Sequence, residues 1–247
     1  MELNISLSPD ILFYIGSFPV TNTFFWSIIV SLFLIIIFVF VGQRMKDIPS
    51  KLQNFIELLV EASYSFVESV IGPGKKAQRI FPLVATMFIF VLVSNLAVFI
   101  PGQSAISINR DGGTLSIFRA VMSDYGLVLV MTLIAVITTQ IVAIAVSGPF
   151  KYIGKFFNFR NPMSFFLGLM DLVGEIAKIV SLSFRLFGNI FAGEVLGMVM
   201  LFLAPFFVPL PFMFLGLLTA VVQAFVFAVL TLVFVSMASE AEAEASN

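Results

Sequence analysis

The sequence contains no cysteine and no histidine among its 247 residues, and only 11% of them are charged. The lack of cysteine excludes disulfides and thiol chemistry, and the lack of both residue types excludes the usual zinc sites. Because histidine is the side chain that titrates near neutrality, any proton handling by this chain must use carboxylates. The net charge of −1 provides no global field that would attract nucleic acid or an acidic substrate.

Apolar residues are abundant instead. They make up 60% of the sequence, and the mean hydropathy is +1.11, which is typical of a polytopic membrane protein. Runs long enough to cross about 30 Å of hydrocarbon cover residues 24–41, 80–101, 125–146, 163–204 and 212–239. The sequence therefore predicts an all-α integral membrane protein with about five transmembrane helices, folded as a single membrane domain over residues 1–247. No internal repeat is visible, so the inverted-repeat architecture of many transporters finds no support.

The distribution of Lys and Arg predicts the orientation. The connections after the first and third runs contain Arg44, Lys46, Lys51, Lys75, Lys76, Arg79, Lys151, Lys155 and Arg160. The connection after the second run contains only Arg110 and Arg119. The excess places the first group in the cytoplasm. The N-terminal segment 1–23, which lacks a signal-peptide pattern, is then an outer segment of the mature protein, and the C-terminus is cytoplasmic.

Residues 50–71 form a different kind of segment, with apolar and polar residues on two sides of one predicted helix. Ser50 and Gln53 have the form of a capping box, and glycines at 72 and 74 end the helix. The polar side is acidic, which argues against attraction to anionic lipid. We expect a helix at the membrane surface that offers carboxylates to a protein partner; the alternative is a short helix packed on its own bundle.

The fourth run, 163–204, would be about 63 Å long as a helix, roughly twice what a perpendicular span requires. The fifth run is also too long for a perpendicular span. Excess length is normally accommodated by tilt. The last two helices are therefore expected to form a long, strongly tilted hairpin.

The fourth run also has an arginine, Arg185, at the depth where hydrocarbon should surround it. A charge there costs at least about 2.5–3.5 kcal/mol and normally marks a functional site. At about 100° per residue, one arc of roughly 80° contains Asp171, Glu175, Lys178, Arg185 and Asn189. Glu194 falls on the opposite face, about 13 Å along the axis from Arg185. Carboxylates thus approach a central positive charge from two ends and two faces, a layout that suits two aqueous half-channels that do not connect.

Several alternatives stay open at this point. Asp171, Glu175 and Lys178 have the spacing of a salt-bridge cluster at the membrane interface. For Glu194, the alternative to a channel role is a buried, protonated carboxyl. The glycines near Arg185 are compatible with plain close packing. On the fifth run Gln223 ends a short polar line and requires partners, with Arg185 or Asn189 within reach. Two polar spots, Ser94-Asn95 and Thr138-Thr139-Gln140, are expected to form interhelical hydrogen bonds or to line the outer channel.

The run from Ser181 to Glu194, SLSFRLFGNIFAGE, resembles the signature of subunit a of rotary F-type ATP synthases. Residues 223–231, QAFVFAVLT, are similar to the last helix of the same family, and Ser94-Asn95 followed by Pro101 is similar too. The resemblance covers nearly the whole chain. It implies an ion-translocating stator that is not an enzyme by itself, with no cofactor and no nucleic acid partner. A bacterial plasma membrane is favoured over an organellar membrane as its location.

The resemblance also implies roles for single residues. Arg185 would face the essential carboxylate of a rotating ring of c subunits and separate inlet from outlet. Glu194 would serve the outer half-channel, and Asp171 matches an acidic position on the inner side. We expect Glu175, one turn further along the same predicted helix, to belong to the inner side as well. Gln223 would orient Arg185, with Asn189 nearby. The helix 50–71 would lie near the b subunits of the peripheral stalk.

Two positions depart from the family pattern. Many relatives have His or Glu where Gly216 stands, as a partner of the outer carboxyl, so water or another span must complete that path here. Many relatives also have Pro where Ile179 stands, which leaves the kink there in doubt. The choice between protons and sodium ions is made mainly in the ring.

Two other functions compete with the stator. An ion-coupled secondary transporter would use Arg185 and Glu194 as a substrate site, but it would need discontinuous helices or a repeat. A structural membrane scaffold would tolerate neutral substitutions of Arg185, Glu194 and Gln223. The sequence has no phosphate-binding glycine loop, so we expect no ATP binding by this chain.

Overall fold

The computed structural model describes residues 9–100, 107–110, 113–148, 152, 154, 162–204 and 207–244. Its helices are α1 (Asn22–Gln43), α2 (Lys51–Ile71), α3 (Lys75–Ala97), α4 (Tyr125–Ser147), α6 (Pro162–Leu203) and α7 (Pro209–Glu244), with a short 3₁₀ helix at Val121–Ser123. Two small hairpins accompany them, formed by β1 (Ile11–Ile15) with β2 (Phe18–Thr21) and by β3 (Ser107–Arg110) with β4 (Gly113–Ser116). The expected all-α membrane fold is confirmed, because five helices are long and apolar enough to cross a membrane.

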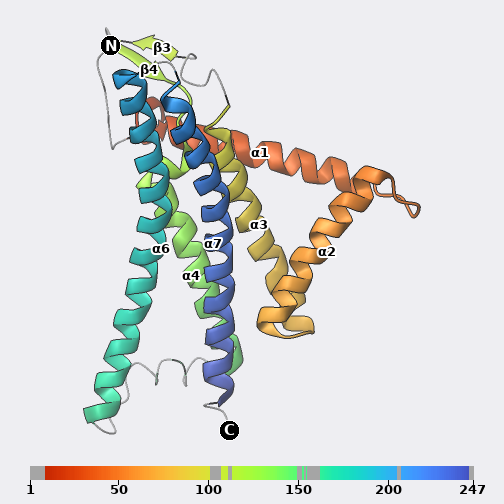
Figure 1. Ribbon diagram of the computed structural model, residues 1–247. Helices are drawn as coiled ribbons and strands as arrows, with labels where there is room; N and C mark the ends of the chain where they lie inside the picture. The colour runs from red at the N-terminus through yellow and green to blue at the C-terminus, as the bar shows by residue number, and fades with distance from the viewer. Residues whose placement is uncertain are drawn as a thin grey trace.

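The centre of the molecule is a bundle of α3, α4, α6 and α7 (Figure 1). Its core contains Met87, Val91, Val128, Leu182, Leu186 and Phe227. Three alanines at helical spacing on α7, namely Ala220, Ala224 and Ala228, are almost fully buried. Small residues let neighbouring backbones approach closely, which is how helices pack tightly in lipid.

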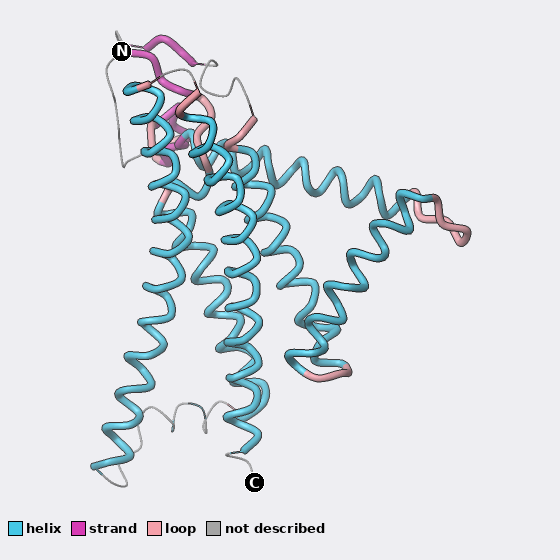
Figure 2. Tube along the Cα trace, in the orientation of Figure 1, coloured by secondary structure: helices cyan, strands magenta, loops and turns pink. Residues whose placement is uncertain are grey.

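The α6–α7 pair is the expected hairpin of two long antiparallel helices (Figure 2). α6 has 42 residues and α7 has 36, while α1 has 22. α1 leaves the top of the bundle and runs at a steep angle to both (Figure 1). A helix of 22 residues is about 33 Å long, which matches one bilayer core. If α1 crosses close to the membrane normal, α6 and α7 must cross it strongly tilted.

The helix α2 begins and ends as its sequence predicts. The Ser50 side chain accepts a hydrogen bond from the Gln53 backbone N–H, and Gly72 ends the helix at φ 90°. Only Val67 is buried, at the end of α2 that contacts α3 and α7. There Tyr64 packs edge-on against Phe81, and a hydrogen bond to the Glu68 carboxylate raises the pKa of Tyr64. Most of α2 is therefore a surface helix, and only its last turns pack on the bundle.

The bounds of α3 differ from the predicted span. The helix begins at Lys75, five residues earlier, and ends at Ala97, before Pro101. The early start reflects Gly74, whose φ of 125° separates α3 from α2. The three basic residues of this helix therefore lie in its first turns and not in a connection.

The N-terminal hairpin goes beyond what the sequence predicts. It turns through two residues, Gly16 and Ser17, with Gly16 at φ 64°, a conformation that tight hairpin turns require. The segment after the hairpin is fastened to the bundle, because the Thr23 hydroxyl donates a 2.7 Å hydrogen bond to the Asp124 carboxylate. Asp124 also accepts from the Gly126 backbone and so caps α4.

Candidate functional site

The polar line on α6 lies on the face that the bundle leaves uncovered. Arg185 and Asn189 are exposed, whereas Leu182 and Leu186, which lie in the same turns of the helix, are buried. Two small residues, Ser181 and Ala192, continue the exposed line on either side. The amphipathic pattern of α6 therefore turns the part of the polar stripe around Arg185 away from the core.

Arg185 lies deep within its helix. It stands 23 residues after Pro162 and 18 before Leu203, or about 35 and 27 Å along the axis. Within the described residues it forms no hydrogen bond and no ion pair. A guanidinium at such a position is too far from either end of the helix to reach the interface. It therefore requires a counter-charge or water from outside this chain.

Four glycines of α6 do not pack closely against another described part of the chain. A Cβ added at Gly174, Gly188, Gly193 or Gly197 would meet no atom within 4 Å. This excludes close packing against another described part of the chain as their reason. These glycines therefore leave open space on α6, both next to Arg185 at Gly188 and further along the helix.

The side chain of Gln223 on α7 contacts α6 one turn after Arg185. Its side chain is 4% exposed, and its Oε1 accepts a 2.8 Å hydrogen bond from Asn189 Nδ2. One turn earlier on α7, the Ala220 carbonyl accepts from Asn95 Nδ2 of α3 at 3.2 Å. Of the two partners expected for Gln223, the structure selects Asn189, and α3, α6 and α7 meet at this point.

A second polar group forms where α4 faces the first half of α6. The Glu175 carboxylate accepts a 2.7 Å hydrogen bond from Lys178 Nζ and a 2.6 Å hydrogen bond from Gln140 Nε2. The Tyr152 hydroxyl donates in turn to Gln140 Oε1. These residues, with Asp171, line a cavity of about 230 Å³. The carboxylates expected on the inner side thus share one polar cavity.

Glu194 lies apart from this cavity, on a half-buried surface of α6. Its Oε2 is buried and has no hydrogen-bond partner within the described structure. The same holds for Ser94 Oγ, Asn95 Oδ1, Thr132 Oγ1 and Gln223 Nε2. Buried polar atoms need partners, and water supplies them where protein does not.

Gly216 is covered by an aromatic ring. A Cβ at this position would lie 3.2 Å from Phe99 Cζ of the segment that follows α3. An ionisable side chain at 216 would therefore have to displace this ring. The apolar ring of Phe99 occupies the space over Gly216.

The two weaker polar spots form interhelical contacts, Asn95 with α7 and Gln140 with α6. Sequence reasoning missed that Gln140 contacts Glu175, and it missed Tyr152 and Phe99. The only sequence feature that singled out Tyr152 was its place among the basic residues at 151–160. No sequence feature indicated the position of Phe99, because that position depends on how α3 ends against α7.

Comparison with known proteins shows the family of the chain. The family model described as ATP synthase A chain matches residues 24–236. A protein named ATP synthase subunit a from Moorella thermoacetica is 33% identical over 228 residues, which are 92% of this chain and 95% of that protein. Proteins of the same name from Geobacter sulfurreducens and Campylobacter concisus are each 34% identical, over 85% and 84% of this chain and 83% and 85% of their own lengths. The chain belongs to the ATP synthase A chain family.

Proposed function

We propose that this chain is the ion-translocating stator of the membrane sector of an ATP synthase, with Arg185 as the electrostatic gate between two half-channels. Membership of the family makes it a non-catalytic membrane-sector subunit of that complex. The observation that carries the finer proposal is the uncovered guanidinium of Arg185 on a glycine-lined face of α6. A ring of c subunits, each with a carboxylate at mid-depth, is the partner that supplies both a counter-charge and close-packed helices.

The inner half-channel is assigned to the cavity beside Glu175 and Asp171. Two carboxylates and a lysine line it together with Gln140 and Tyr152. Such a cavity stabilises water and passes a proton between hydrogen-bonded groups. It lies in the first half of α6, on one side of Arg185 along the helix.

The outer half-channel is assigned to the region of Glu194. This carboxyl lies on the other side of Arg185 along α6, and its Oε2 is buried without a protein partner. Buried atoms with unfilled hydrogen-bonding capacity continue onto α3, α4 and α7, at Asn95, Thr132 and Gln223. Water is the partner that would complete this path, because Phe99 covers Gly216.

The proposed cycle uses the separation of these two regions. A proton enters from the outside by way of Glu194 and neutralises a ring carboxylate, which then turns into lipid. After almost a full turn the ring site meets the inner cavity, where the positive charge of Arg185 favours the ionised carboxylate. A membrane potential of 100 mV contributes about 2.3 kcal/mol for each proton moved, and several steps drive one ATP synthesis elsewhere in the complex.

Gln223 and Asn189 position the arginine in this scheme. Because Asn189 donates through Nδ2 to Gln223, its Oδ1 is left as an acceptor on the face of α6 that presents Arg185. Asn189 follows Arg185 by four residues, so the two side chains are neighbours on that face. Gln223 thus acts on Arg185 through Asn189.

The partners and orientation belong to the same proposal. The chain is a multi-pass membrane protein. We place it in the bacterial plasma membrane with the N-terminus outside, because basic residues gather where α1 meets α2 and where α3 begins. Lys151, Lys155 and Arg160, which support this orientation, lie outside the described residues. The exposed carboxylates of Glu57 and Glu61 on α2 are offered to the b subunits of the peripheral stalk.

The test is Arg185→Ala in the assembled complex. Proton-driven ATP synthesis and ATP-driven pumping should vanish while the chain still co-purifies with a small, carboxylate-bearing hairpin protein. Lys76→Ala, which removes an exposed cation at the start of α3, is the control and should keep both activities. Wild-type pumping by Arg185→Ala would refute the gate, and transport by the purified chain alone would favour a secondary transporter.

A further inference from the structure

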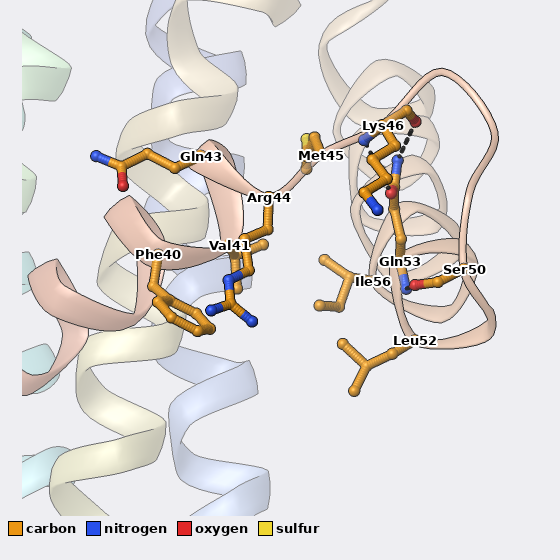
Figure 3. Close-up of a pocket in the computed structure, with 10 residues that line it drawn as sticks. All are labelled: Phe40, Val41, Gln43, Arg44, Met45, Lys46, Ser50, Leu52, Gln53 and Ile56. Atoms are coloured by element: carbon orange, nitrogen blue, oxygen red, sulfur yellow. Dashed lines mark hydrogen bonds between the residues drawn. The ribbon is translucent and has the colours of Figure 1, made fainter.

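A cavity of about 610 Å³ opens where α1 ends and the chain turns back into α2. Figure 3 shows that its walls come from both helices and from the turn between them. It lies far along the chain from Arg185, and no step of the proposed ion path uses it. Its lining combines two cations with apolar side chains, so it differs in character from the polar cavity beside Glu175.

The cations are Arg44 and Lys46. The Arg44 guanidinium lies 4.0 Å from the centre of the Phe40 ring, and both charged side chains are exposed. The aromatic ring holds the guanidinium at the wall of the cavity. Neither cation forms a salt bridge within the described part of the chain, so both charges remain available to an anion.

The turn that presents them is fixed to α2. The Gln53 side chain accepts from the Lys46 backbone N–H at 3.1 Å and donates to the Lys46 carbonyl at 2.9 Å. It also donates to Glu57 Oε1 at 2.8 Å. Asp47 is exposed in the same turn. The backbone of Lys46 is therefore held in place while its ammonium group stays free.

The remaining wall is apolar and open. Leu52 is 69% exposed and Met45 is 51% exposed, and Leu52 and Ile56 point from α2 toward the end of α1 (Figure 3). α1 itself is a candidate span of which only 6% is buried in the protein. The apolar side of the cavity is thus continuous with a helix surface that faces lipid.

We propose that this cavity binds an anionic phospholipid, with the phosphate between Arg44 and Lys46 and an acyl chain against Phe40, Leu52 and Ile56. The occupant must carry negative charge for the cations and a hydrocarbon chain for the apolar wall. The end of a membrane span borders the cavity, so a lipid of the adjacent leaflet meets both requirements without leaving the bilayer. A protein carboxylate would satisfy the cations but would leave the apolar wall uncovered.

The experiment measures lipid retention by the purified full chain with native mass spectrometry, in the presence of phosphatidylglycerol or phosphatidylcholine. Wild type should retain phosphatidylglycerol in preference to phosphatidylcholine. Each of R44Q and K46Q should weaken retention about fivefold, which is the contribution of one cation near an anionic lipid surface. The double variant should weaken retention roughly 30-fold, because the two contributions multiply. The control K75Q/K76Q removes two cations at the start of α3, outside the cavity, and should retain the lipid as wild type does.

Leu52→Glu tests the same site if the double variant does not fold. Leu52 is largely exposed, so the new carboxylate leaves the fold intact while it repels the anionic headgroup, and retention should fall. Inorganic phosphate at millimolar concentration should not displace the lipid, because it has no acyl chain. Wild-type lipid retention by R44Q/K46Q, or full displacement of the lipid by phosphate, would overturn the proposal.

Discussion

Asn189 of α6 donates a 2.8 Å hydrogen bond to Gln223 of α7, and the glutamine side chain is 4% exposed. The bond ties the two long helices together one turn from Arg185. Because Gln223 Nε2 has no partner in the described structure, the glutamine contributes to this contact through its acceptor. The pair therefore fixes which atoms of Asn189 remain for the arginine.

Gln223→Leu should impair ion transport more than it impairs stability. The substitution removes the acceptor of Asn189, whose amide then loses its orientation beside Arg185. A hydrogen bond of this kind contributes about 0.5–1.5 kcal/mol, so proton-driven ATP synthesis in membrane vesicles should fall severalfold. Thermal unfolding should change little, because the variant also removes a buried donor that has no partner.

A double-variant cycle separates this role from a general packing effect. Asn189→Ala combined with Gln223→Leu should be no worse than the more damaging single change, since both remove one interaction. Thr219→Ala is the matched control on α7, because that hydroxyl bonds only to the Leu215 carbonyl of its own helix. Additive losses in the double variant would contradict the positioning role.

Gly188→Leu should leave the subunit folded and abolish its coupling to the ring. A Cβ at Gly188 meets no atom within 4 Å, and replacing a helical glycine with leucine gains up to about 1 kcal/mol of helix stability. The branched side chain would instead occupy the space into which a ring helix fits. ATP-driven pumping by the assembled complex is the measurement.

Gly42→Leu is the companion control for this prediction. Gly42 also faces open space, but it lies on α1 and away from the charged face of α6. It should keep wild-type pumping. Normal pumping by Gly188→Leu would show that no partner approaches this face of α6.

Periodicity and end signals predicted much of this architecture. Ser50 caps α2, and the charged stripe of α6 follows the helical spacing of its residues. These features are local, because each depends on residues within a few turns of one helix. The same reasoning predicted two long helices from length alone, and their antiparallel pairing follows from the short connection at 204–208.

Contacts between helices were less accessible to sequence reasoning. Gln140 was recognised as a polar spot, but its contact with Glu175 depends on how α4 is rotated against α6. The choice of Asn189 for Gln223 depends on the register of the hairpin. Phe99 over Gly216 depends on where α3 stops. Rotation, register and termination are decided by packing over the whole bundle, which no local pattern encodes.

Gly216→Ala should destabilise the protein through Phe99. The new methyl group would lie 3.2 Å from the ring, so the ring must shift by a few tenths of an ångström. Overpacking of this kind typically costs about 1–3 kcal/mol. Alanine gains up to about 1 kcal/mol over glycine within a helix, so the net change should lower the midpoint of thermal unfolding. Phe99→Leu in the same chain should restore part of that loss, and an unchanged midpoint in Gly216→Ala would show that the ring moves freely.

Single cysteines should report the orientation of the chain, because the natural sequence has none to give background labelling. Lys46→Cys in the α1–α2 turn should react with a membrane-impermeant maleimide only from the cytoplasmic side. Ser17→Cys in the turn of the N-terminal hairpin should react only from the outside. Both positions are exposed, so a silent site cannot be explained by burial, and the reversed pattern would overturn the orientation drawn from the basic residues.

Gln140→Leu should slow ion release on the inner side without affecting assembly. Gln140 donates to Glu175 and accepts from Tyr152, so its loss leaves Glu175 held by Lys178 alone and removes a polar link across the cavity. Tyr152→Phe should have a smaller effect in the same direction, because it removes only the hydroxyl that donates to Gln140 and leaves the bond from Gln140 to Glu175 in place. Thr138→Val is the control, since that hydroxyl bonds only to the Ile134 carbonyl of its own helix. Pumping rates in vesicles should fall severalfold for Gln140→Leu and stay near wild type for Thr138→Val, and equal rates in all three variants would remove this network from the ion path.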